Sequence, residues 1–128
     1  MRNYRDLDVW KHSHKLTLDL YEASKKFPKE EMFGLTSQLR RATISIGANL
    51  AEGCGRRTTP EFARFIRIAM GSASELDYHL LLCRDFGFLT NEFYDRTAKE
   101  LTTVRKMLFA LLTSVENQIQ AKALAAKG

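Results

Sequence analysis

The fold is decided by the stretch TPEFARFIRIAMGSASELDYHLLLCRDFG, residues 59–87. Apolar side chains recur in it at every third or fourth position, which is the spacing of one face of an α-helix. Thr59, Pro60 and Glu61 predict the start of that helix, as its N-cap, its first helical residue and an acid at the positive end of the helix dipole. Gly87 suits the left-handed conformation that ends many helices. One long amphipathic helix is therefore expected.

Three further helices are expected around this stretch. The first spans about residues 8–27, where Pro28 stops it, and the second spans about residues 34–57 after a short charged connection. The fourth begins after Thr90 as its N-cap and carries an apolar stripe over residues 93–119. Amphipathic helices joined by short turns bury their apolar faces together when they alternate in direction. The predicted fold is all-α, an antiparallel up-down-up-down four-helix bundle.

The length of the chain indicates one domain. With 128 residues, it has enough side chains for a single core, and two domains would each have a marginal one. We therefore expect residues 1–128 to form one domain, ordered over about residues 6–120, with an alanine- and lysine-rich end at 121–128 that frays. No apolar run resembles a signal peptide or reaches the roughly 18 residues that cross a membrane. The sequence predicts a cytoplasmic protein without a membrane partner.

The middle of the chain favours arginine over lysine. Between Lys29 and Lys99 there is no lysine, although the net charge of the chain is +5. The planar guanidinium of arginine binds carboxylates and phosphates in a fixed geometry, whereas lysine suits a loosely solvated surface. This region is therefore the expected contact surface. The candidate nucleic-acid-binding residues are Arg40, Arg41, Arg56, Arg57, Arg64 and Arg67.

Two of the expected helices carry small and apolar residues on faces that the core does not need. These residues are candidates for an oligomer interface, because tyrosine, leucine and arginine together are typical of interfaces. They are Ile44, Gly47, Ala48, Ala51, Ile68, Gly71, Tyr78 and Leu82. The alternative is that they are scattered exposed apolar residues, which monomers also carry. We expect an interface because two neighbouring helices show the same feature.

A narrow polar line runs beside the core stripe of the second helix. Its candidate members for a structural hydrogen-bonded network are Gln38, Ser45, Asn49 and Glu52. Such a network would fix the register of helices or subunits; the alternative is a ligand site.

No group of residues predicts catalysis. Di-iron bundles need Glu-x-x-His pairs from two helices, and Glu75 with His79 has the wrong spacing and no second copy. His12 and His14 point apart on a helix, and Cys54 and Cys83 lack metal-ligand spacing, so the two thiols are expected as small core residues without a disulfide. We therefore expect no enzyme activity, no metal and no cofactor. The run of residues 53–57 could hold an anion, but it also serves simply to end a helix and reverse the chain.

The runs FGLTSQLRRA at residues 33–42 and ISIGANLAEG at residues 44–53, with Glu61-Phe62, residues 68–73 and Glu75-Leu76, form a specific pattern. It resembles the bacterial four-helix-bundle proteins first named for reading frames inside 23S ribosomal RNA intervening sequences. The resemblance implies a bundle that assembles as a ring, a homopentamer, in a family with no established biochemical activity. The chain is also similar to the accessory proteins of diversity-generating retroelements, pentameric bundles with a basic surface that bind nucleic acid and a reverse transcriptase.

Two functions follow as hypotheses. The first is a non-enzymatic homo-oligomer that binds structured RNA through its arginines, with weak sequence specificity and strong salt dependence. The second is a structural or adaptor oligomer that binds a protein partner. In that case the arginines are used in intersubunit ion pairs with Glu52, Glu61, Glu75 or Asp77. Exposure of the arginines distinguishes the two.

Overall fold

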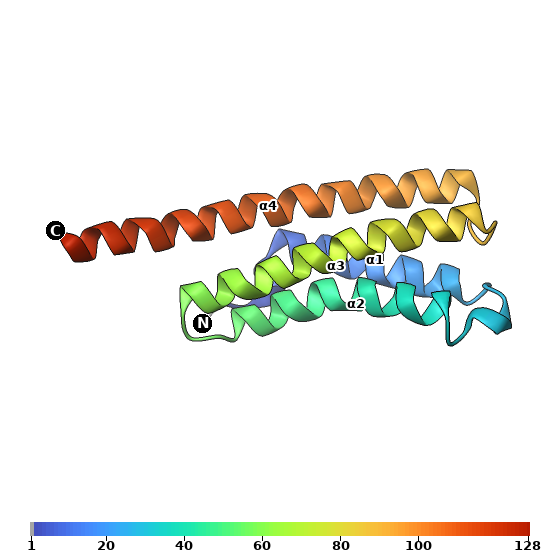
Figure 1. Ribbon diagram of the computed structural model, residues 1–128, viewed down its shortest axis with the longest axis horizontal. Coiled ribbons are helices and arrows are strands. Elements are labelled where there is room, and N and C mark those ends of the chain that lie inside the picture. The colour runs from blue at the N-terminus through green and yellow to red at the C-terminus, as the bar shows by residue number, and fades with distance from the viewer. Residues whose placement is uncertain (1) are drawn as a thin grey trace.

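The computed structural model describes residues 2–128 and consists of long antiparallel helices (Figure 1). They are α1 (Asp8–Ser24), α2 (Leu35–Cys54), α3 (Thr59–Asp85) and α4 (Asn91–Lys127), with short 3-10 helices η1 (Tyr4–Asp6) and η2 (Lys29–Glu31). No strand occurs within residues 2–128. Successive connections lie at alternate ends of the molecule, so the helices run up, down, up and down (Figure 1). The predicted all-α four-helix bundle is confirmed.

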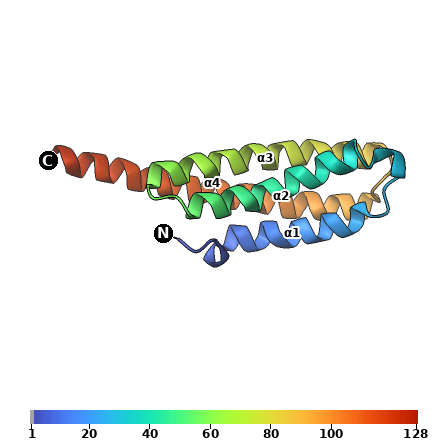
Figure 2. The ribbon, with the colours of Figure 1, turned by 90° about the horizontal axis from the view of Figure 1, so that it is seen from below.

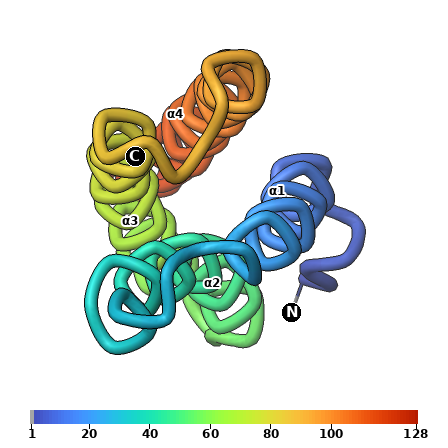
Figure 3. The backbone as a smooth tube through the Cα atoms, turned by 90° about the vertical axis from the view of Figure 1, so that its right-hand side faces the viewer, coloured from blue at the N-terminus to red at the C-terminus, as the bar shows by residue number. Residues whose placement is uncertain are grey.

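The helices enclose one core. Each helix packs against the next one in sequence, and α1 packs against α4, as the end-on view shows (Figure 3). The contact between α2 and α3 is the most extensive. The largest completely buried side chains come from all four helices: Leu16, Leu20, Leu39, Ile46, Leu50, Phe62, Ile66, Leu76, Leu80, Leu101, Val104 and Leu108. Burying a side chain of this size stabilises the fold by about 1.5–3 kcal/mol, so this core supplies most of the driving force.

The two thiols belong to this core. Cys54 and Cys83 are buried and free, as their sequence surroundings predicted. Burial raises the pKa of the Cys83 thiol to about 12, and the nearby Glu31 carboxylate adds to that shift. Burial also raises the pKa of Cys54, against an opposing effect of Arg2. Both side chains therefore stay neutral and unreactive near neutral pH.

Two helices end earlier than their sequences predicted. α1 ends at Ser24 instead of Phe27, because the Lys25, Lys26 and Phe27 N–H groups donate to carbonyls three residues back instead of four. The Phe27 ring is buried and its centroid lies 5.5 Å from that of Phe88. α2 ends at Cys54 instead of Arg57. There the Gly55 N–H bonds to the Ala51 and Glu52 carbonyls and closes the last turn.

The start of α3 is displaced by one residue from the prediction. Thr58, not Thr59, is the N-cap, and its Oγ1 accepts a hydrogen bond from the Glu61 N–H at 3.3 Å. The other caps agree with the sequence: Gly87 has φ +80°, and Thr90 Oγ1 accepts from the Phe93 N–H at 3.1 Å.

The C-terminal end of α4 is helical where the sequence predicted fraying from residue 121. The helix continues to Lys127 and projects past the α2–α3 turn (Figures 1 and 2). Neither glycine nor proline occurs in α4, and its last residues are alanine, leucine, lysine and glutamine, which favour helix. We call residues 119–127 the overhang. In residues 2–128 we find no helix with the length and apolar character needed to cross a membrane.

Candidate functional site

The six candidate arginines do not form one continuous surface. Arg40 is held against α1: its Nε donates to Ser24 Oγ at 2.8 Å, and its guanidinium lies 4.0 Å from the centroid of the Tyr21 ring. Since both contacts lie inside the protomer, they fix the guanidinium between α1 and α2. Arg40 thus joins two helices and is only partly exposed.

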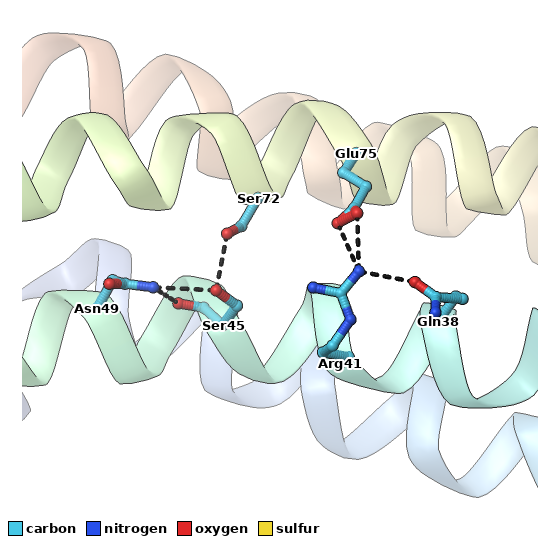
Figure 4. A network of polar contacts seen from close by, with 6 residues as sticks. All are labelled: Gln38, Arg41, Ser45, Asn49, Ser72 and Glu75. Atoms are coloured by element: carbon cyan, nitrogen blue, oxygen red, sulfur yellow. Dashed lines mark hydrogen bonds and ion pairs between the residues drawn. The ribbon is translucent and has the colours of Figure 1, made fainter.

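Two further arginines are paired with acids of the same chain. Arg41 Nη2 lies 3.0 Å from Glu75 Oε2 and donates to Gln38 Oε1 at 2.7 Å (Figure 4). Arg67 Nη1 lies 3.5 Å from Glu116 Oε2 and links α3 to α4. These exposed pairs are each worth only about 0–1 kcal/mol, so they orient the guanidiniums more than they stabilise the fold.

The remaining arginines gather at the α2–α3 turn. Arg56 and Arg64 lie on the Phe65 ring, with guanidinium carbons 4.9 and 5.0 Å from its centroid. Arg56 also pairs with Glu52 at 2.8 Å, whereas Arg57 and Arg64 form no ion pair with any residue in 2–128.

A fourth arginine that the sequence analysis did not select lies at the same end. The guanidinium carbon of Arg2 lies 4.3 Å from the centroid of the Phe62 ring, and the backbone N–H of Arg2 donates to the Cys54 carbonyl at 3.2 Å. No sequence signal marks this approach, since it depends on how the N-terminal segment crosses the end of α2. We name Arg2, Arg56, Arg57 and Arg64 the basic end.

The predicted polar network is divided into separate groups. Ser45 Oγ lies 2.8 Å from Ser72 Oγ, and Asn49 Nδ2 donates to the Ser45 carbonyl and hydroxyl at 2.8 and 2.9 Å (Figure 4). Gln38 belongs instead to the Arg41–Glu75 group, and Glu52 pairs with Arg56. The four predicted residues Gln38, Ser45, Asn49 and Glu52 all form side-chain hydrogen bonds, but in three separate groups. The Ser45 and Arg41 groups do cross between α2 and α3 and hold their register.

Some candidate interface residues of α2 and α3 are exposed to solvent. Ile44, Ile68 and Tyr78 are 47%, 41% and 59% exposed, which is high for large apolar side chains. Ala48 and Gly71 are also exposed, and Leu82 is half-buried. We call Ile44, Ala48, Ile68, Gly71 and Tyr78 the outer face.

Gly47 and Ala51 serve packing inside the protomer. They are half-buried and line a shallow recess with Trp10 and Tyr4. A Cβ at Gly47 would lie 3.3 Å from Trp10 Nε1, so the missing side chain makes room for the indole of α1. α2 continues through Gly47 without a break.

No three His, Cys, Asp or Glu side chains in residues 2–128 come close enough to hold a metal ion. Glu75 is held by Arg41, and His79 lies half-buried beside Tyr78. The arrangement therefore offers charged and apolar binding surfaces.

Comparison with known proteins assigns the chain to a family. The model of the family described as 23S rRNA-intervening sequence protein matches residues 5–110. A crystal structure of a protein with unknown function from the S23 ribosomal protein family of Bacteroides thetaiotaomicron has a TM-score of 0.76 and 25% sequence identity to it. That similarity covers 82% of this chain and 95% of the other. The search of curated proteins found no match. Since the family match spans most of its length, this chain belongs to the 23S rRNA-intervening sequence protein family.

Proposed function

We propose that the protein is a non-enzymatic, homo-oligomeric binding module of the cytoplasm, assembled as a pentamer, that binds structured RNA. The observation that carries this proposal is the basic end. Arg57 and Arg64 have no acidic partner within residues 2–128, and Arg2 and Arg56 lie beside them on the rings of Phe62 and Phe65. A phosphate backbone supplies the charge that such a cluster lacks.

The manner of binding follows from the side chains available. Phe62 and Phe65 are buried beneath the arginines, so their rings are not free to stack on bases. Contacts are therefore made to phosphates, which carry no sequence information directly. We expect weak sequence preference and strong salt dependence.

Assembly uses the outer face of α2 and α3. Its large apolar residues Ile44, Ile68 and Tyr78 are exposed in the protomer, and the small exposed residues Ala48 and Gly71 leave room for another backbone. Burial of such side chains against a second copy removes apolar surface from water. A ring would also repeat the basic end once in every protomer and multiply its weak phosphate contacts.

A second candidate function is an adaptor that binds a protein partner, such as a reverse transcriptase. It is favoured by the intrachain pairing of Arg41 with Glu75 and of Arg67 with Glu116. These pairs reduce the number of arginines free for phosphate.

The proposal is tested by light scattering with and without a labelled RNA hairpin, at low and moderate salt. We expect a mass near five protomers. RNA should raise this mass at low salt but not at moderate salt. The double variant Arg57→Ala/Arg64→Ala should flatten the slope of log affinity against log salt by about 1–2, since each phosphate contact contributes roughly 0.7–0.9.

The matched control is Lys26→Ala/Lys29→Ala, which removes the same charge from exposed residues elsewhere in the chain. Equal losses in both variants would mean that net charge alone attracts RNA. A stable oligomer that ignores RNA would favour the adaptor.

A further inference from the structure

The overhang of α4 and the α2–α3 turn enclose a groove of about 680 Å³. Arg57, Thr58 and Pro60 line it from the turn, and Ile119, Lys122 and Ala126 line it from α4. We propose that this groove receives the sugar–phosphate backbone of an RNA strand. The inference rests on the proposed function and adds to it a second wall, which is made by the end of α4.

The charge of the groove is of one sign. Its only ionisable lining residues are Arg57 and Lys122, and no carboxylate lines it. Neither cation pairs with an acid in residues 2–128, and the nearby Glu116 is occupied by Arg67. Two uncompensated cations facing one cavity favour an anionic occupant.

The neutral lining suits the rest of a nucleotide backbone. Thr58 Oγ1 accepts the cap hydrogen bond from the Glu61 N–H, which leaves its own hydroxyl proton free to donate to a phosphate oxygen. Pro60 and Ile119 provide apolar surface for the sugar, and the small Ala126 leaves the α4 wall open. The volume of the groove lies within the roughly 300–1,000 Å³ that is usual for ligand sites, which is large enough for such a segment.

The groove continues the basic end. Arg57 belongs to both, and Lys122 lines the groove from α4. A strand that passes between the turn and the overhang therefore meets basic residues along its path. The α4 wall lies beyond residues 5–110 that the family model matches.

The test compares Lys122→Glu with Lys99→Glu in the full chain. Both residues are exposed on α4 and both substitutions change the charge equally, but Lys99 does not line the groove. With a fluorescent RNA hairpin as probe, Lys122→Glu should weaken binding about tenfold and lower the salt slope by about 1, while Lys99→Glu stays within about twofold. Circular dichroism and light scattering confirm that both variants keep their helices and mass.

Each other outcome overturns a defined part of the argument. If Lys122→Glu binds like the wild type while Arg57→Ala/Arg64→Ala does not bind, the groove is not the site and the proposed function remains. If the wild type binds no RNA, the proposed function fails as well. If a polyglutamate peptide binds more tightly than RNA at the same salt, and the Lys122→Glu variant no longer binds the peptide, the groove takes an acidic protein segment instead.

Discussion

Gly53 and Gly71 are both helical, but they have opposite surroundings. A Cβ at Gly53 would lie 2.8 Å from Phe65 Cβ and 3.1 Å from Phe62 Cδ1, whereas nothing lies within 4 Å of one at Gly71. Gly53→Ala should therefore lower the free energy of unfolding by about 1–3 kcal/mol through overpacking. Within a protomer kept from assembling, Gly71→Ala should raise it by about 0.5–1 kcal/mol, because alanine restricts the unfolded chain and meets no neighbour there. Urea denaturation at equal protein concentration measures both. Equal effects at the two sites would contradict the close packing of α2 on α3.

Burial of the Cys83 thiol makes stability depend on alkaline pH. The folded state raises its pKa from 9.0 to about 12, because burial disfavours the thiolate. The resulting stabilisation is fully present below pH 9 and is lost as the pH rises toward 12. The wild type should therefore lose stability relative to Cys83→Ala when urea midpoints are compared at pH 8 and pH 10.5. A constant difference between the two proteins would show that the thiol is not shielded.

The start of α3 gives a prediction at the scale of one helix. Thr58 Oγ1 accepts from the Glu61 N–H, whereas Thr59 is already helical. Thr58→Ala should thus cost about 0.5–2 kcal/mol of stability, and Thr59→Ala about 0.5 kcal/mol or less. Thermal unfolding of the two variants measures the difference. A larger loss for Thr59→Ala would return the cap to the residue that the sequence favours.

The same threonines show how much of a helix end can be predicted from the sequence. The helices follow from apolar spacing, and Gly87 and Thr90 lie at the caps that the sequence predicted. Thr58 and Thr59 have the same side chain, and their neighbours point in different directions. Pro60 at the first helical position favours Thr59 as the cap, whereas Glu61 three residues after Thr58 has the spacing of a capping box. Phe27 fits the helical stripe and is buried, yet it lies beyond the end of α1, because the following Pro28 disfavours helical backbone at the residue before it.

The site depends on the whole molecule and was less predictable than the fold. Sequence shows that arginine is concentrated between Lys29 and Lys99, but not which guanidiniums find partners. Arg41 meets Glu75 across 34 positions of sequence, and Arg67 meets Glu116. Arg2 and Lys122 come from the two ends of the chain and approach the α2–α3 turn only in the folded molecule.

Assembly through the outer face gives a prediction for the whole molecule. Ile68→Asp should reduce the mass in solution from an oligomer to a protomer while helicity is kept, because Ile68 is 41% exposed within the protomer. Light scattering with circular dichroism measures both quantities. Leu18→Asp is the control, since Leu18 is an exposed leucine of α1 outside the outer face. Dissociation by the control alone would move the interface to α1.

The joint between α1 and α2 contains Trp10, the only tryptophan in the chain. Its indole stacks on the His14 ring, with the ring centroids 4.8 Å apart, and lies edge-on to the Tyr4 ring, with the centroids 4.9 Å apart. It also lies over Gly47. If α1 separated from α2, the indole would enter water and its fluorescence emission would move to longer wavelength. Ellipticity would change little as long as the helices themselves persisted. The protein therefore carries an intrinsic optical reporter of a single helix contact, and no dye has to be attached to follow it.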